Sequence, residues 1–211
     1  MVKSFDIKVS GENCAKAAEV MKTRLKERGF SLSDDGARVI FDTDRSLPEG
    51  AFAITEHGES VVITACDKAG FLHGAGKFLR GIRYTKDGAE LCAQSGVVVP
   101  ECSVRGIYFA SHFHNFYHVA TLPEIERYLE DLALWGYNYL MAVYPAIDLE
   151  SETSPEFKAQ VKRLADLLNI AKKVGLKTFG PPPTATWQNV CTPEEIEAAL
   201  KAAVELGFKR I

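Results

Sequence analysis

Residues 106–144 read GIYFASHFHNFYHVATLPEIERYLEDLALWGYNYLMAVY, and this stretch decides the fold class. It runs from a short apolar strand, through a helix with apolar residues at every third or fourth position, to a second apolar strand at 139–144. Thr121 and Glu124 form a capping box that opens the helix, and Gly136 ends it. A strand, a helix and a strand in this order predict a βα unit with parallel strands.

The same unit is repeated toward the end of the chain. The expected elements are a helix between Ser154 and Gly175, a strand at 176–179, a helix between Thr192 and Gly207, and the start of a further strand at 208–211. Because no Gly-x-Gly-x-x-Gly turn follows a strand, a dinucleotide-binding open sheet is disfavoured. We therefore expect residues 97–211 to form the first part of a (β/α)8 TIM barrel, with about three βα units and the start of strand four.

Residues 1–96 have a different order of elements. The expected elements are a strand at 5–9, a helix with Cys14, Ala18, Met21 and Leu25 on one face, strands at 38–41, 51–55 and 60–64, and a helix carrying Phe71, Ala75, Phe78 and Ile82. The order βαβββα predicts a small α+β accessory domain, and residues 96–100 are expected to be a connector. The whole chain is therefore of the α/β class.

Composition excludes several kinds of partner. The net charge is −3, and the 25 basic and 28 acidic residues are spread along the chain, so we expect neither nucleic acid nor a membrane as a partner. The first residues lack the apolar core of a signal peptide, so a cytoplasmic location is expected, or secretion if a leader precedes residue 1. Five cysteines without a Cys-x-x-Cys pair are expected to be reduced thiols.

Two segments resemble a known group of enzymes. Val104-Arg-Gly-Ile107, followed at 128–140 by Tyr-Leu-x-x-Leu-Ala-x-x-Gly-Tyr-Asn-Tyr-Leu, resembles the start of the catalytic barrel in β-N-acetylhexosaminidases and α-glucuronidase-like glycosidases. Residues 60–70, SVVITACDKAG, are similar to part of their accessory domain. The resemblance implies a carbohydrate-active parent protein for N-acetylhexosamine or uronic acid substrates.

The resemblance also implies where the chemistry lies. In such enzymes the catalytic carboxylates follow barrel strand four, so we expect them downstream of residue 211. No catalytic residue is assigned within this chain, which we expect to be inactive alone. Glycoside hydrolysis needs a general acid together with a carboxylate nucleophile or an acid that orients the substrate amide.

Candidate substrate-binding residues come from the barrel-like half. The resemblance makes Arg105 a sugar-contacting residue, with a guanidinium that suits two adjacent hydroxyls; the alternatives are that it caps the barrel floor or pairs with an acid. After the second strand, the His-rich and Asp-rich segment of those hexosaminidases is replaced by AVYPAID at 142–148. Tyr144 is expected to line the sugar site, and Asp148 to accept hydrogen bonds from hydroxyls.

The densest chemical cluster is 112–118, HFHNFYH, just past the first strand of the barrel. We expect His112, His114 and Asn115 to line a sugar pocket, because the loops after such strands build active sites. Two open alternatives are an ordinary polar loop and a metal site on His112 and His114, which would need ligands from later strands. Trp187, in the loop after the third strand, is a candidate platform for a sugar face.

The sequence thus supports a fragment of a glycoside hydrolase-like protein that acts on carbohydrate. A non-catalytic carbohydrate-binding or structural fragment and a metal-dependent hydrolase using His112 and His114 are the alternatives. If the chain is a fragment of a glycoside hydrolase-like protein, we expect no cofactor and no bound metal. Unpaired strand edges at 106–110 and 208–211 predict self-association or pairing with a missing half.

Overall fold

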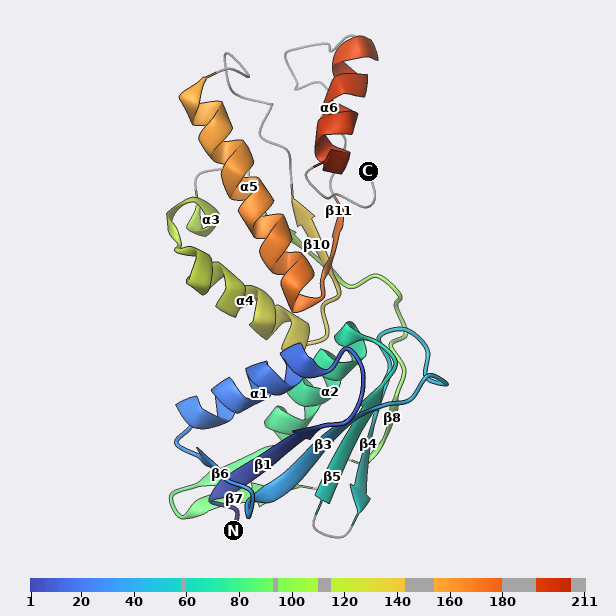
Figure 1. The fold of residues 1–211 in the computed structure, drawn as a ribbon, viewed down its shortest axis with the longest axis vertical. Coiled ribbons are helices and arrows are strands. Elements are labelled where there is room, and N and C mark those ends of the chain that lie inside the picture. Colours follow the sequence, from blue (N-terminus) through green and yellow to red (C-terminus); the bar gives the residue numbers. More distant parts are fainter. Residues whose placement is uncertain (58–59, 93–94, 110–114, 143–153, 180–192, 206–211) are drawn as a thin grey trace. The chain divides into compact units, whose positions relative to one another are not determined.

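A computed structural model describes residues 1–57, 60–92, 95–109, 115–142, 154–179 and 193–205 (Figure 1). The chain divides into two compact units, each described by itself below. The first unit comprises Met1–Ser103 together with Glu130–Gly136, and the second comprises Val104–Leu129 and Tyr137–Ile211. The domain boundary expected between residues 96 and 97 stays a prediction.

The first unit is a sheet with two helices on one face (Figure 1). Its elements are β1 (Ser4–Val9), α1 (Ala15–Glu27), β2 (Ser31–Leu32), β3 (Ala37–Thr43), β4 (Phe52–His57), β5 (Ser60–Ala65), α2 (Lys68–Gly81), β6 (Ile82–Thr85), β7 (Gly88–Leu91) and β8 (Gly96–Val98). In the described residues the strand order is β2-β1-β3-β5-β4-β8, and β6 and β7 form a separate hairpin. Strands β1, β3 and β5 are parallel, whereas β4 is antiparallel to β5 and β8.

The apolar helix faces expected from the sequence are buried in this unit. Cys14, Met21 and Leu25 of the first helix region and Phe71 and Ala75 of α2 are each fully or almost fully buried. They pack toward Phe5, Phe41 and Ile63 of the sheet, which are also at 0% exposure. Phe41 and Phe71 meet edge to face with ring centroids 6.1 Å apart.

Two expectations for this unit are wrong. Helix α2 ends at Gly81, so Ile82, expected on its apolar face, is the first residue of β6. Residues 96–98 are not merely a connector, because Gly96–Val98 is strand β8, which pairs antiparallel with Phe52–Ile54 of β4. The valines of this strand are exposed, at 63% for Val97, so no burial pattern marked them. Only pairing with a strand about 45 residues earlier identifies this edge strand.

Asp6 is a buried charge on the sheet. Its side chain is only 5% exposed and lies 3.0 Å from Nε of Arg38 and 3.1 Å from Nζ of Lys8. Burial opposes ionisation of this carboxyl, but the hydrogen bonds and charges of Lys8 and Arg38 outweigh it and lower the pKa of Asp6. The two basic side chains therefore keep a carboxylate stable in the sheet.

The second unit is built on parallel strands. Its described elements are β9 (Gly106–Phe109), α3 (Phe116–Val119), α4 (Leu122–Leu134, whose last turn belongs to the first unit), β10 (Tyr139–Ala142), α5 (Pro155–Val174), β11 (Lys177–Phe179) and α6 (Pro193–Glu205). The strand order is β11-β10-β9, and both pairings are parallel. The βα repeat expected from the sequence is confirmed in this mixed α/β arrangement, while the complete layout of a barrel remains a proposal.

Helix ends follow the local signals in the sequence. At the start of α4, the Glu124 carboxylate accepts from the Thr121 N–H at 2.7 Å and the Thr121 hydroxyl at 2.8 Å, which lowers the pKa of Glu124. Ser154 caps α5 by accepting from the Phe157 N–H at 3.1 Å. Gly175 ends that helix at φ 97°, a left-handed conformation that glycine adopts without strain.

Two features of the second unit were not predicted from the sequence. Helix α3, which has four residues, was not among the expected elements. Val204 of α6 is an exposed apolar side chain, at 59%. The predicted strand at 208–211 lies outside the described residues.

Among the described helices, none is both long enough and apolar enough to span a membrane.

Candidate functional site

The carboxyl ends of β9, β10 and β11 lie at one edge of the parallel sheet. These ends are Phe109, Ala142 and Phe179, and in α/β folds such an edge is where ligand-binding loops begin. The predicted sugar-contacting residues follow these strand ends in the chain. His112, His114, Tyr144, Asp148 and Trp187 lie outside the described residues, so their roles stay predictions.

Asn115 is described, and it acts as the N-cap of α3. Its side-chain oxygen accepts from the Tyr117 N–H at 2.9 Å, and the Asn115 N–H donates to Nδ1 of His118 at 3.4 Å. The Asn115 side chain also accepts from the His118 N–H, so Asn115 and His118 form a capping box. Asn115 is half-buried, so it has a structural role at the end of the segment that follows β9.

An aromatic cluster holds α3 against the carboxyl end of β9. The Tyr117 ring is 3% exposed and meets Phe109 edge to face at 5.5 Å. Phe109 also contacts Tyr128 of α4 at 6.0 Å. Burial raises the pKa of Tyr117 to about 12, with the nearby charge of Arg163 partly opposing the shift. Tyr117 is therefore a neutral phenol near pH 7, and its ring serves packing.

Arg105 lies at the other end of the same strand. It precedes β9, its N–H donates to Oδ1 of Asn138 at 2.8 Å, and its carbonyl accepts from the Asn138 N–H at 3.0 Å. The Asn138 carbonyl in turn accepts from the Lys177 N–H at 2.9 Å. These bonds tie the amino ends of the three strands together and place the backbone of Arg105 at that edge of the sheet, while the role of its side chain stays a prediction.

The two faces of the sheet have different neighbours. One face of the sheet carries Ile107, Phe109 and Leu140, and there the ring of Phe109 contacts the ring of Tyr128 of α4. The opposite face carries Tyr108, Tyr139, Met141 and Phe179; the rings of Tyr139 and Phe179 are 5.8 Å apart, and Tyr108 is 48% exposed. In the described residues, β9 and β11 each pair with β10 only. The outer edges of β9 and β11 suit pairing with further strands of a larger sheet.

Three acidic side chains on the helices of the second unit have structural partners. Glu124 caps α4, Glu126 lies 2.9 Å from Lys173, and Asp166 lies 3.0 Å from Lys162. These pairs lie on helix surfaces rather than at the carboxyl ends of the strands. They do not form the close pair of carboxylates that glycoside hydrolysis needs.

The metal alternative has no support in the described part of the chain. There, no group of three or more His, Cys, Asp or Glu side chains is placed to hold a metal ion. His112 and His114, the two histidines on which that alternative rests, lie outside the described residues.

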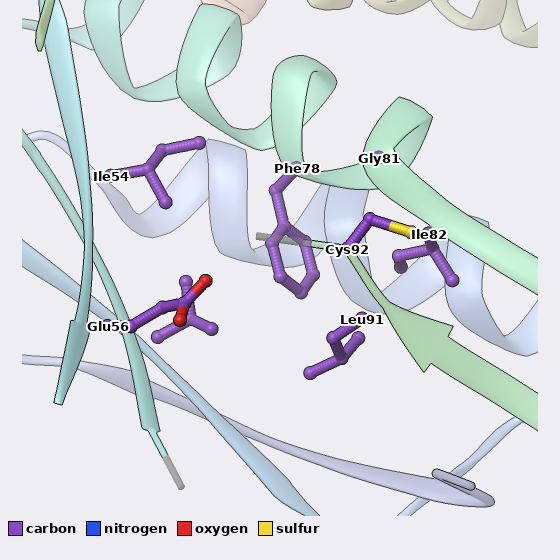
Figure 2. A pocket seen from close by; sticks show the side chains of 8 residues that line it. Ile54, Glu56, Phe78, Gly81, Ile82, Leu91 and Cys92 are labelled. Atoms are coloured by element: carbon purple, nitrogen blue, oxygen red, sulfur yellow. The ribbon is translucent and has the colours of Figure 1, made fainter. Parts of the chain in front are cut away.

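A small pocket in the first unit was not expected from the sequence. Figure 2 shows Ile54, Phe78, Ile82 and Leu91 around it, with Cys92 beside them. Its volume is about 20 Å³, which is room for roughly one water molecule. A monosaccharide does not fit in this space, so the pocket is a packing gap between α2, the sheet and the β6–β7 hairpin.

A wider hollow of about 650 Å³ lies at the amino ends of β1, β3 and β5 in the same unit. Lys3, Asp34, Asp35 and Arg38 supply charges of both signs to its lining. None of the residues that line it is aromatic, so it lacks the flat apolar ring on which a sugar face packs. Its size would admit a small ligand, but its chemistry does not favour carbohydrate.

Sequence reasoning missed Arg163, which the structure brings to α3. Its guanidinium hydrogen-bonds to the carbonyl oxygens of Tyr117 and Ala120, and its carbon Cζ lies 5.4 Å from the centre of the Tyr117 ring. A faint signal existed, because Arg163 precedes Leu167 by four residues and so lies near the buried stripe of α5. The partner, 46 residues away, could not be predicted.

Comparison with known proteins adds information on the fold. No family profile matches the chain, and no curated protein matches it. Among solved structures, a glycoside hydrolase family 20 exo-β-N-acetylglucosaminidase from Vibrio harveyi, in complex with N-acetylglucosamine, is 17% identical with a TM-score of 0.66; the match covers 97% of this chain and 35% of that one. A β-N-acetylhexosaminidase from Bacteroides fragilis is 14% identical with a TM-score of 0.62, over 98% of this chain and 44% of that one.

A third similar structure belongs to another enzyme family. It is a glycoside hydrolase family 138 enzyme that targets the pectin rhamnogalacturonan II, 16% identical with a TM-score of 0.68, over 96% of this chain and 29% of that one. This chain therefore spans between 29% and 44% of the length of these three proteins. At such identities the likeness concerns the fold alone: the chain has a glycoside hydrolase-like fold.

Proposed function

We propose that this chain is part of a glycoside hydrolase-like protein that acts on carbohydrate of the N-acetylhexosamine or uronic acid type. The observation that carries the proposal is a fold similarity that extends over 97% of the chain to a carbohydrate-cleaving enzyme. The parallel strands β9, β10 and β11 support it, because their carboxyl ends precede the segments that hold the predicted sugar-contacting residues.

The proposed sugar site consists of side chains that follow the carboxyl ends of the strands. His112, His114 and Asn115 follow β9, Tyr144 and Asp148 follow β10, and Trp187 follows β11. Aromatic rings pack on pyranose C–H groups, and the polar side chains orient hydroxyls. Arg105 stays a weaker member of this set, because its backbone lies at the amino edge of the sheet.

The catalytic carboxylates are proposed to lie on residues beyond 211. More than half of each similar enzyme has no counterpart in this chain. Within the second unit, Glu124 caps α4, and Glu126 and Asp166 form ion pairs. In this proposal, the missing part supplies a general acid and either a nucleophile or an acid that orients the substrate amide. The present chain supplies part of the sugar-binding edge.

The chain offers a direct test of sugar binding because it contains two tryptophans, Trp135 and Trp187. In a Trp135→Phe variant, fluorescence reports Trp187 alone, and we expect a saturable change on titration with N-acetylglucosamine or glucuronic acid. The matched control is Trp187→Phe, which leaves Trp135, a 68% exposed residue below the guanidinium of Arg80. This control should give no saturable change. The same response in both variants, or none in Trp135→Phe, would contradict the placement of the site.

Hydrolysis is tested separately with 4-nitrophenyl N-acetyl-β-glucosaminide and 4-nitrophenyl β-glucuronide. The complete product of the native gene should release 4-nitrophenol, and residues 1–211 alone should not. Release by residues 1–211 would mean that the carboxylates lie within this chain. Sugar binding without hydrolysis by the complete gene product would favour the non-catalytic carbohydrate-binding alternative.

A further inference from the structure

Helix α3 is too short to be stable by itself. Its four residues, Phe116–Val119, make barely one turn, and helix nucleation is unfavourable without tertiary contacts. A helix end also leaves carbonyl oxygens without partners inside the helix. The conformation of α3, and of its cap residue Asn115, therefore depends on groups supplied from elsewhere in the second unit.

Arg163 of α5 supplies the donors at the carboxyl end of α3. Its Nε donates to the Tyr117 carbonyl at 2.8 Å, and its Nη2 hydrogen-bonds to the carbonyls of Tyr117 and Ala120. A cation at this end also interacts favourably with the helix dipole. The planar guanidinium reaches two acceptors at once, which the single ammonium of lysine does less well.

Tyr117 connects this contact to the sheet. Its ring packs between Phe109, the last residue of β9, and the guanidinium of Arg163, whose Cζ lies 5.4 Å from the ring centre. At the other end of α3, Asn115 and His118 close the capping box. Three sets of contacts therefore fix α3: its own cap, the end of β9, and Arg163.

We propose that Arg163 is a positioning residue for the sugar site: it holds α3, and with it Asn115, in the binding conformation without touching the sugar. The inference rests on the proposed function for the role of Asn115 in sugar binding. Arg163 itself lies on α5 with its guanidinium on the backbone of α3. Its loss should therefore act on the ligand only through the conformation of residues 115–120.

The test compares Arg163→Ala and Arg163→Lys with Lys173→Ala in the full chain. Lys173 is a matched control, because it is also a cation of α5 and also joins that helix to another, through Glu126 at 2.9 Å. Two readouts are needed. Sugar affinity is measured by the Trp187 titration described above, and the state of α3 by amide exchange at residues 117–120 and by the side-chain nitrogen signals of His118, with His57 and His73 of the first unit as internal references.

We expect Arg163→Ala to weaken sugar binding tenfold or more, to speed exchange at residues 117–120 tenfold or more, and to shift the His118 signals. Arg163→Lys should give an intermediate result, and it serves as the test variant if Arg163→Ala does not fold. Lys173→Ala should match the unmodified chain in both readouts. The signals of His57 and His73 should stay unchanged throughout.

Three outcomes would overturn the inference or separate it from the proposed function. Unchanged exchange and unchanged His118 signals in Arg163→Ala would show that Arg163 does not fix α3. Weaker sugar binding with unchanged exchange would mean that Arg163 contacts the sugar itself. If the unmodified chain binds no sugar while exchange responds to Arg163→Ala, the proposed function fails, and Arg163 is reduced to a structural clamp on α3.

Discussion

Gly74→Ala should destabilise the first unit, although alanine is the better helix former. Gly74 lies in α2 facing the sheet, and a Cβ atom added there would lie 2.6 Å from Cγ2 of Ile63 and 3.3 Å from Cδ2 of Phe52. Ile63 is fully buried and branched at Cβ, so it cannot swing aside. Replacing a helical glycine by alanine gains about 0.5–1 kcal/mol, whereas overpacking costs about 1–3 kcal/mol. We expect a net loss of about 1–2 kcal/mol.

The assay is urea unfolding in a Trp187→Phe background, where the fluorescence of Trp135 reports the first unit. The Ile63→Ala variant removes Cγ2, and in that background Gly74→Ala should be neutral or stabilising, because its methyl group fills part of the cavity. Lys68→Ala, at an exposed position of the same helix, should stay within about 0.5 kcal/mol of the unmodified chain. Equal effects of Gly74→Ala in both backgrounds would refute the steric argument.

Three further predictions concern charges and buried phenols. Because the pKa of Asp6 is lowered in the folded state, Asp6→Asn should destabilise at pH 7. The difference should begin to shrink as pH falls below about 4, where the unfolded carboxyl is protonated, and should vanish once the folded carboxyl is protonated too. Urea unfolding between pH 7 and pH 3 checks this, and a difference that does not shrink over that range would contradict it. Because the pKa of Tyr117 is raised to about 12 in the folded state, its phenol contributes to the unfolding free energy below about pH 10, and this contribution is lost as pH rises toward 12. Tyr117→Phe should therefore lose less stability between about pH 10 and pH 12 than the unmodified chain. An unchanged dependence of stability on pH would argue against the buried phenol. The side chain of Glu130 is 12% exposed and lies 2.7 Å from Lys16 and 2.9 Å from Arg24 within the first unit. Glu130→Gln should therefore lower the unfolding free energy of that unit by about 2 kcal/mol. Glu12, which forms an exposed ion pair with Arg45, is the control, and Glu12→Gln should change the unfolding free energy by under about 0.5 kcal/mol.

Local elements and their class could be predicted from the amino-acid sequence. Helix α4 begins at the capping box of Thr121 and Glu124, and helix α5 begins after Ser154 and ends at Gly175. Such ends can be predicted because a cap depends on groups within about four residues. The alternation of strand and helix after residue 104 predicted parallel strands, which β9, β10 and β11 confirm. The resemblance to glycosidases likewise agreed with the fold of the similar structures.

Features that join distant segments could not be predicted and depend on tertiary packing. Strand β8 exists because residues 96–98 meet β4, and α3 persists because Arg163, 46 residues away, binds its carbonyls. The place of Arg105 at the amino edge of the sheet likewise follows from its bonds to Asn138, 33 residues later. Such contacts depend on how whole strands and helices pack, and periodicity within a window of a few residues does not contain that information.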